Sequence, residues 1–312
     1  MKITPLEAAV GAEVSDVDVR DLDATSAAEL ADAWARHGVL FLRDQHLTPE
    51  EHVEFAERFA SIDINKFFTA VEGHPKVAQV LKEADQEGNI GGGWHTDHSY
   101  DEIPARGSIL HALEIPPAGG DTRFLSVGAA YAALAELTEL PEPVVEALET
   151  HQPGFAQRCE EVGAGVAFQD ALCRLEAHHS NEHIFGAEAA HAKEREGRLG
   201  NPDGVGSTVH PVIVAHPSTG QPLLYVNMAF TTTFVGWERE ASDQLFRFLL
   251  SFICDGGFDT QFAWAPGSIA MWDNRSTWHW ALNDYQGHRR LLHRITISGE
   301  PLSAAPSPLL TA

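Results

Sequence analysis

The sequence predicts a mainly β protein with flanking helices. The N-terminal segment carries capped helical patterns around one short apolar run. From about residue 77 onward, short apolar runs alternate with Gly, Pro and polar residues, which is typical of strands joined by loops. Of the 312 residues, 44% are hydrophobic, which is enough for a large core. We therefore expect strands to form that core and the helices to support it.

Capping patterns predict two helices near the N-terminus. Ser26 and Glu29 form a capping box, which predicts a helix over Ala27–Arg36 that stops near Gly38. The run Val39–Leu42 is short and apolar, as in a buried strand. A second helix follows, whose N-cap, first-turn proline and closing glutamate are Thr48, Pro49 and Glu51. We assign both helices to packing rather than chemistry.

Short apolar runs continue through the rest of the chain as candidate strands. They are Val77–Leu81, Gly107–Leu113, Thr122–Leu125, Pro211–Val214, Leu223–Val226, Ser268–Trp272 and Leu291–Ile297. Seven or eight runs of this length fit a double-stranded β-helix, the jelly-roll closure of cupin-like folds. The predicted core is therefore a jelly roll.

The segment over residues 150–206 has an irregular pattern. It contains the pair His178-His179 and the charged run Lys193-Glu194-Arg195-Glu196. A connection this long is usually a lid or a disordered segment. We expect an insertion that covers the site as a lid, and a solvated or capping role for the two histidines.

The net charge and the cysteine content indicate which binding partners and which cellular compartment to expect. A formal net charge of −24 argues against nucleic acid and anionic membranes, because both require a basic surface. Cys159, Cys173 and Cys254 show no metal-like spacing, and an odd number favours reduced thiols in a reducing compartment. The chain has no long apolar segment at its start. A cytoplasmic protein is therefore expected.

A candidate metal site begins in the segment Trp94–Asp97. On an extended backbone His95 and Asp97 project to the same side, because they are two residues apart. His279, far downstream, can complete a set of two imidazoles and one carboxylate. Such a set suits non-haem Fe(II) with positions left open for chemistry. Because the ligands lie at both 95 and 279, we expect a single domain over residues 1–312.

Further motifs accompany these ligands. They are Gly119-Gly120-Asp121-Thr122, Trp272-Asp273-Asn274-Arg275 and Arg289-Arg290-Leu291-Leu292-His293-Arg294. Over most of its length the chain thereby resembles the taurine and 2,4-dichlorophenoxyacetate dioxygenase family. The resemblance implies Fe(II) at the metal site, with 2-oxoglutarate and O2 as co-substrates. Asp97 stands where halogenases of this family have a small residue, so the resemblance implies an oxygenase or a desaturase.

The resemblance also implies roles for Thr122 and Arg290, which would hold the distal carboxylate of 2-oxoglutarate. Arg suits this role because it presents a planar fork and stays charged. Arg294 follows four residues later on the same face of the same predicted strand. In relatives the residue here often binds the anionic end of the substrate, and a structural role is the alternative.

Substrate contacts are also inferred from the resemblance. Taurine dioxygenase has a His, a Tyr and an Asn where this chain has Asn65, Phe68 and Gly91, so taurine itself is not expected. Phe67 and Phe68 favour a more apolar substrate body. The other candidate pocket residues are Lys66, Ser99, Tyr100, Asn227 and Phe230. We expect a small anionic substrate: a carboxylate, a sulfonate or an amino-acid derivative.

The implied reaction couples decarboxylation of 2-oxoglutarate to hydroxylation of the substrate, and collapse of the product can cleave a C–O, C–N or C–S bond. Two alternatives remain from the residues alone. The same ligands could hold Zn(II) in a hydrolase or isomerase. The barrel could instead bind a small acid without catalysis. Relatives are often homo-oligomers, so a homo-oligomer is an expectation by analogy.

Overall fold

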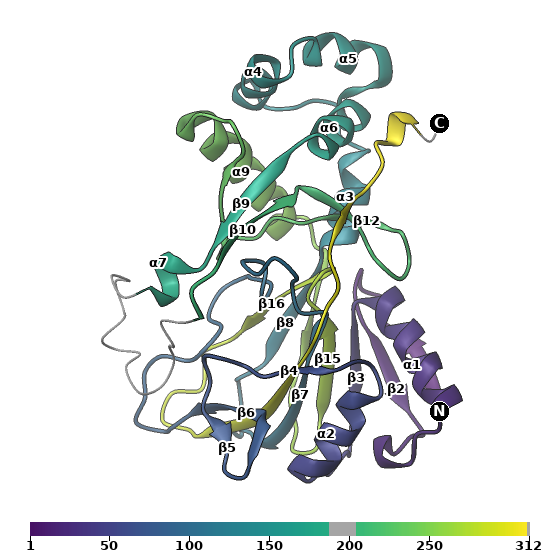
Figure 1. Ribbon diagram of the computed structural model, residues 1–312, viewed down its shortest axis with the longest axis vertical. Coiled ribbons are helices and arrows are strands. Elements are labelled where there is room, and N and C mark those ends of the chain that lie inside the picture. The colour runs from purple at the N-terminus through teal and green to yellow at the C-terminus, as the bar shows by residue number, and fades with distance from the viewer. Residues whose placement is uncertain (187–203, 311–312) are drawn as a thin grey trace.

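The computed structural model describes residues 1–186 and 204–310, and it confirms a sheet-rich core with flanking helices (Figure 1). The strands are β1 (Lys2–Pro5), β2 (Ala12–Ser15), β3 (Val39–Leu42), β4 (Ile62–Asp63), β5 (Ala70–Val71), β6 (His74–Lys82), β7 (Gly107–Glu114), β8 (Thr122–Ser126), β9 (Glu176–Ser180), β10 (Ser207–Pro211), β11 (Ile213–Ala215), β12 (Pro222–Leu224), β13 (Thr231–Phe234), β14 (Asp259–Phe262), β15 (Ile269–Asp273), β16 (Thr277–Ala281), β17 (Arg290–Ile297) and β18 (Ser303–Ala304). The helices are η1 (Val19–Asp21), α1 (Ala24–His37), α2 (Pro49–Glu57), α3 (Val127–Leu134), α4 (Glu142–His151), α5 (Phe155–Val162), α6 (Ala164–Cys173), α7 (Glu182–Phe185), α9 (Arg239–Asp255) and η3 (Pro308–Leu310). No helix within these ranges is long and apolar enough to cross a membrane.

Two sheets pack against each other in the middle of the molecule. The larger runs in the order β1-β2-β3-β15-β7-β17-β6-β5, with β4 added beside β17, and the smaller runs β14-β8-β16. Leu110 and Trp272 of the larger sheet share one apolar cluster with Phe124 and Phe262 of the smaller one. This packing of two sheets is the predicted jelly roll.

The two N-terminal helices form as predicted, with one correction. Helix α1 begins at Ala24, three residues before the expected start, because the Asp23 side chain accepts from the Ser26 backbone N–H at 2.7 Å. Asp23 is therefore the N-cap, and Ser26 lies in the first turn. Helix α2 has the predicted capping box between Thr48 and Glu51.

Two of the predicted strands are divided or cut short, whereas the bounds of the other five move by no more than three residues. The run Pro211–Val214 is divided, since β10 ends at Pro211 and β11 begins at Ile213. Between them the Val212 N–H donates to the Leu175 carbonyl at 2.9 Å, so the chain changes partner at this point. The run Leu223–Val226 is shorter than expected, because β12 ends at Leu224.

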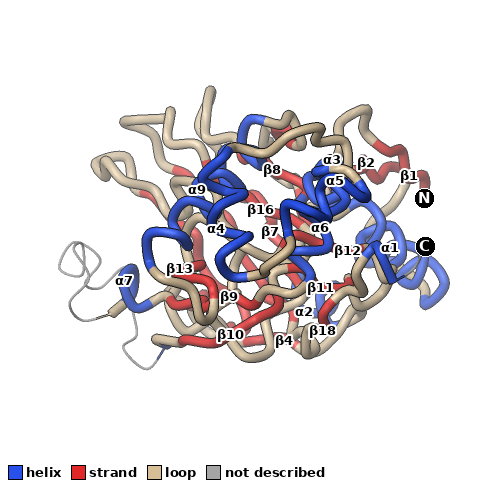
Figure 2. Tube along the Cα trace, turned by 90° about the horizontal axis from the view of Figure 1, so that it is seen from above, coloured by secondary structure: helices blue, strands red, loops and turns tan. Residues whose placement is uncertain are grey.

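The expected irregular insertion is largely regular, so that interpretation was wrong for its first part. Helices α5 and α6 lie with α4 and α9 above the sheets at one end of the molecule (Figures 1 and 2). Phe155, Phe168 and Leu172 are fully buried in the same apolar cluster as Leu249 of α9. This part of the segment is a packed layer of helices.

The remainder of the insertion reaches toward the site. His178 is exposed on β9, but His179 is fully buried beside His210 and Tyr225, which corrects the expected solvated role. Phe185 of α7 stacks on Phe67 with ring centroids 4.4 Å apart. The charged run over residues 193–196 lies outside the described residues.

A buried histidine cluster joins α2 to the larger sheet. His111 of β7 pairs directly with His293 of β17, and the His52 ring of α2 lies 5.8 Å from that of His111. Neither ring nitrogen of His52 has a hydrogen-bond partner among the described residues. Burial lowers the pKa of all three imidazoles, and that of His293 falls to about 4. The cluster is therefore neutral at pH 7.

We predict that this cluster makes the fold sensitive to acid. The folded-state pKa values lie below the unfolded value near 6.5, so the folded state binds fewer protons than the unfolded chain between those values. The contribution of the neutral cluster to the free energy of unfolding is therefore complete above about pH 6.5. It decreases as the pH drops toward 4. Urea unfolding of the metal-free protein at pH values between about 4 and 6.5 measures this decrease in the free energy of unfolding. His52→Leu should reduce it, whereas the exposed control His288→Gln should not; equal losses in both variants would contradict the prediction.

Candidate active site

The two candidate imidazole ligands are joined through their backbones. His279 lies in β16, and His95 lies in the loop that follows β6. The His95 N–H donates to the His279 carbonyl at 3.2 Å, and the His279 N–H donates to the His95 carbonyl at 2.8 Å. This isolated antiparallel bridge places residues 95 and 279 directly opposite each other. Their ring centroids are 4.1 Å apart.

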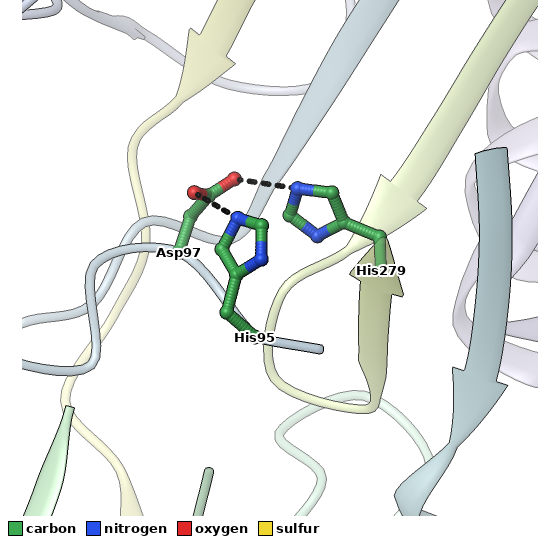
Figure 3. A group of neighbouring side chains, drawn as sticks. All are labelled: His95, Asp97 and His279. Atoms are coloured by element: carbon green, nitrogen blue, oxygen red, sulfur yellow. Dashed lines mark ion pairs between the residues drawn. The ribbon is translucent and has the colours of Figure 1, made fainter. Parts of the chain in front are cut away.

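Asp97 completes a group of three potential metal ligands (Figure 3). Its Oδ1 lies 3.7 Å from His95 Nε2, and its Oδ2 lies 3.6 Å from His279 Nε2. All the candidate ligand atoms lie within 4.8 Å of one another. Within residues 1–186 and 204–310, this is the one group of three or more such side chains close enough to hold a metal ion.

The orientation of the donor atoms suits a divalent metal. The His95 Nδ1–H donates to the Gly93 carbonyl at 2.9 Å, which leaves the lone pair of Nε2 for the metal. Arg294 Nη2 donates to Asp97 Oδ2 at 2.8 Å. Burial acts to raise the pKa of Asp97, but Arg294 and His279 lower it overall, so the carboxylate is ionised. Two neutral imidazoles and a carboxylate are the facial set of non-haem Fe(II) sites.

The turn before β16 holds His279 in place. It contains the predicted Trp272–Arg275 motif, in which Asp273 and Arg275 are buried. Arg275 donates to both oxygens of Asp273, at 2.8 and 2.6 Å, and His216 Nε2 lies 3.2 Å from the same carboxylate. A buried ion pair with these additional bonds is costly to break. The motif therefore fixes the turn rather than taking part in chemistry.

Arg290 and Thr122 lie near each other, and both have N–H or O–H groups that are free to donate a hydrogen bond. Arg290 is 4% exposed, and its Nε and Nη2 have no hydrogen-bond partner among the described residues. The Thr122 hydroxyl accepts from the Trp264 indole N–H at 3.0 Å, so its own proton can be donated to another group. The Arg290 guanidinium lies 5.7 Å from the ring of the same Trp264. Both side chains can therefore donate to one carboxylate.

Arg294 lies closer to the metal ligands than Arg290 does. Its Nη2 donates to Asp97 and also to the Ser108 hydroxyl at 2.8 Å. Its Nε is buried and has no partner in the described part of the chain. The Phe68 ring lies 5.5 Å from its guanidinium carbon. Arg294 thus orients the ligand carboxylate and retains donor capacity toward the cavity.

A single cavity of ≈ 720 Å³ contains all these groups. Its polar lining includes the three candidate ligands together with Thr122, Arg290 and Arg294. The rest of its wall is mostly apolar, with Phe67, Phe68, Val80, Tyr100, Leu110, Ile184, Phe185, Met228, Phe230 and Trp272. The cavity can therefore hold a metal, a small dianion and an apolar molecule together.

The structure divides the predicted substrate residues into two groups. Those that line the cavity are Asn65, Phe67, Phe68, Gly91, Tyr100 and Phe230. Lys66 is exposed outside it, and Ser99 and Asn227 are buried behind its wall. Asn227 donates to the Ser99 hydroxyl at 2.9 Å and accepts from the Phe230 N–H at 2.9 Å. These two residues therefore support the wall and do not contact its contents.

Several cavity residues were not predicted from the sequence. Ile184 and Phe185 belong to a helix of four residues inside the segment we expected to be irregular. Trp272 was noted only as part of a motif, although strand alternation places it on the inward face beside Ala270. Trp264, which does not line the cavity but donates to the Thr122 hydroxyl, lies in a loop that gives no signal at all. Met228 lines the mouth and is 46% exposed.

Comparison with known proteins identifies the family. The family model described as "Taurine catabolism dioxygenase TauD, TfdA family" matches residues 2–296. An alkylsulfatase of Acinetobacter baylyi is 30% identical over 98% of this chain and 87% of its own length. A (S)-phenoxypropionate/alpha-ketoglutarate-dioxygenase of Sphingobium herbicidovorans is 29% identical over 96% of each chain.

A solved structure agrees with these matches. The crystal structure of a taurine dioxygenase from Burkholderia xenovorans is 30% identical, with a TM-score of 0.71 over 98% of this chain and 92% of that one. The chain therefore belongs to the taurine catabolism dioxygenase TauD, TfdA family, and it is an enzyme of the 2-oxoglutarate-dependent non-haem iron dioxygenase class.

Proposed function

We propose that this enzyme uses Fe(II), 2-oxoglutarate and O2 to hydroxylate a small organic anion with an apolar body. The observation that carries this proposal is the buried guanidinium of Arg290, whose unpartnered donors line the same cavity as the metal ligands. A buried cation without a partner is costly unless an anion binds to it. The distal carboxylate of 2-oxoglutarate is such an anion.

Each polar group then has a role in holding the reactants. His95, Asp97 and His279 would bind Fe(II), which supplies the redox chemistry that converts 2-oxoglutarate and O2 to succinate and carbon dioxide. Arg290 and Thr122 bind and orient the co-substrate. Arg294 donates to Asp97 Oδ2, so Oδ1, the oxygen nearer His95 Nε2, would be free to bind the metal. The aromatic wall excludes water from the reacting groups.

The cavity favours a substrate larger and less polar than taurine. The aromatic side chains Phe67, Tyr100 and Phe230 form one buried cluster in its wall. At position 91 a glycine adopts a φ of +81°, and a Cβ there would lie 3.3 Å from His95 Cε1, so this position offers no polar side chain. Arg294 is the cation that remains for the anionic end of the substrate. An alkyl or aryl sulfate ester, sulfonate or carboxylate matches these groups.

The activities of two relatives support this substrate class. One relative is named as an alkylsulfatase and another as a phenoxypropionate dioxygenase. Hydroxylation of a carbon bonded to oxygen gives an unstable product, so either substrate type can end in C–O cleavage. The Zn(II) hydrolase and the non-catalytic barrel are disfavoured, because neither has use for both the ligand group and the Arg290–Thr122 pair.

The domain organisation, the cellular location, the lid and the oligomeric state are also proposed or predicted. We propose one dioxygenase domain over residues 1–312, because β8, β16 and β17 all contribute to one cavity. We propose a cytoplasmic location, since Cys159, Cys173 and Cys254 are free thiols. A lid role stays a prediction for the part of the insertion that includes α7. A homo-oligomer is likewise a prediction.

Succinate formation tests the proposed function. Anaerobic protein with Fe(II) and 2-oxoglutarate should produce succinate once air is admitted, and faster with one class of alkyl or aryl sulfate ester, sulfonate or carboxylate. Arg290→Met should abolish most of this turnover at low 2-oxoglutarate, because it removes the cation and keeps the apolar bulk. Absence of succinate with every compound, and no change in the iron absorption spectrum on adding 2-oxoglutarate, would refute the proposal.

Metal affinity tests the ligand assignment without turnover. Asp97→Ala should weaken Co(II) binding at least about 100-fold, because even the loss of an outer-shell contact typically costs about 10- to 100-fold. Titration calorimetry of the metal-free protein measures this affinity. The exposed His178→Ala serves as the control and should bind Co(II) like the wild type. Equal affinities in the two variants would exclude Asp97 as a ligand.

Trp264 should position Thr122 for the co-substrate. Trp264→Phe keeps an aromatic ring near Arg290 but removes the indole donor to the Thr122 hydroxyl. We expect the KM for 2-oxoglutarate to rise about 3- to 10-fold, as for the loss of one hydrogen bond, with little change in kcat. Trp237→Phe, which alters a ring stacked on His151, is the matched control. A fall in kcat without a change in KM would contradict this role.

A further inference from the structure

A second buried cation lies next to Arg290. Lys82 of β6 is its direct cross-strand neighbour, because β6 and β17 pair in the register Lys82–Arg290. Directly opposed side chains share one face of a sheet, with Cβ atoms about 5 Å apart. The next pairs on this face are Val80 with Leu292 and Ala78 with Arg294. Lys82, the last residue of β6, thus lies on the sheet face that also carries both arginines. It is only 3% exposed.

The two cations lie against the same aromatic ring. The ammonium of Lys82 is 4.3 Å from the ring centroid of Tyr285, and the guanidinium carbon of Arg290 is 5.9 Å from it. Burial raises the pKa of the Tyr285 phenol, so the ring stays neutral and supplies no counter-charge. It offers Lys82 the weaker attraction between a cation and a π face, and its phenol oxygen also interacts with the Arg290 side chain.

Neither cation has an acidic partner. In the described ranges, no carboxylate oxygen lies within 4.0 Å of Lys82 or Arg290. Lys82 Nζ donates only to the Gln286 amide oxygen, at 3.2 Å. Asp121, which follows the Gly119-Gly120 turn, accepts instead from Gln261 at 2.7 Å. Two adjacent buried cations therefore lack an anion in a chain whose net charge is −24.

We propose that Lys82 is a positioning residue that selects a 2-oxo dicarboxylate as co-substrate, by adding positive potential behind Tyr285 at the site of the distal carboxylate. This inference rests on the proposed function. Lys82 does not line the cavity, so it acts across the Tyr285 ring and not by contact. In a buried site a charge at this range still has a large effect, because solvent screens it weakly.

The proposal predicts a specific pattern of binding. The distal carboxylate is attracted by both cations, whereas a 2-oxo monocarboxylate of the same length has no group there for either to attract. Lys82 should therefore matter for 2-oxoglutarate and not for 2-oxopentanoate. In the absence of any anion the two cations repel each other, so removal of Lys82 should not lower the stability of the protein.

The test compares Lys82→Met with Lys82→Arg, which restores the charge. Dissociation constants for 2-oxoglutarate and 2-oxopentanoate are measured by titration of the Co(II)-loaded protein without oxygen, together with the KM and kcat of the Fe(II) enzyme. In Lys82→Met we expect both the dissociation constant and the KM for 2-oxoglutarate to rise roughly five- to twentyfold, with kcat nearly unchanged. The constant for 2-oxopentanoate should stay the same, and Lys82→Arg should restore most of the loss.

Lys76→Met is the matched control, because Lys76 lies on the same strand and its removal changes the net charge equally. Its side chain is 45% exposed and pairs with Glu57 outside the cavity. Unchanged 2-oxoglutarate binding in Lys82→Met, or an equal loss for both acids, would overturn the proposal. Where Lys82→Met does not fold, Lys82→Gln takes its place under the same criteria. Wild-type protein that fails to bind 2-oxoglutarate would instead refute the proposed function.

Discussion

The pair of backbone hydrogen bonds between His95 and His279 is the constraint on which the rest of the site depends. It fixes two imidazoles from segments 184 positions apart in the chain at a ring separation of 4.1 Å. Strand β16 can offer this bridge only because its other edge is paired with β8, where His279 lies opposite Phe124. The position of His279 opposite His95 therefore depends on the pairing of the smaller sheet.

The arrangement of charge explains how so acidic a chain can bind anions. Arg290 and Arg294 lie on the same inward face of β17, four residues apart, and both are buried. Arg294 donates to the carboxylate of Asp97, although its Nε has no partner among the described residues. Arg290 lies beside the rings of Trp264 and Tyr285 and opposite Lys82. Because buried charges interact more strongly than exposed ones, this local pair outweighs a diffuse surface charge of opposite sign. Among the described residues no carboxylate forms an ion pair with Arg290, which supports its proposed role in binding an anionic co-substrate.

The sequence was sufficient for the features that depend on local pattern. The capping box of α2 and strand β3 follow from local pattern, the group of three ligands begins with a short motif, and Arg290 was assigned from the resemblance to the family. Strand β16 was missed because Thr277–Ala281 contains no apolar run, since one of its positions carries a metal ligand. Helix α6 was missed because its glycine-flanked start resembles a loop, although its buried face packs on α3 and η3. Trp264 and Tyr285 approach Arg290 from loops, and no local rule predicts such contacts.

Strands carry one candidate metal ligand and the groups proposed to bind the co-substrate, whereas short connecting segments form most of the wall around the substrate. This difference explains how one family can act on many substrates. The candidate metal ligand His279 and the proposed anion-binding side chains Thr122 and Arg290 lie on β16, β8 and β17, whose register permits little variation. Val80, Leu110 and Trp272 of the strands contribute to the apolar wall, but its larger part comes from short segments that meet only in the fold: residues 65–68, 98–100, 184–185 and 228–230. Replacements in such segments change the shape of the cavity without altering the strand pairing that holds the metal. Relatives near 30% identity can therefore share the iron and co-substrate chemistry while differing in the molecule that this wall encloses.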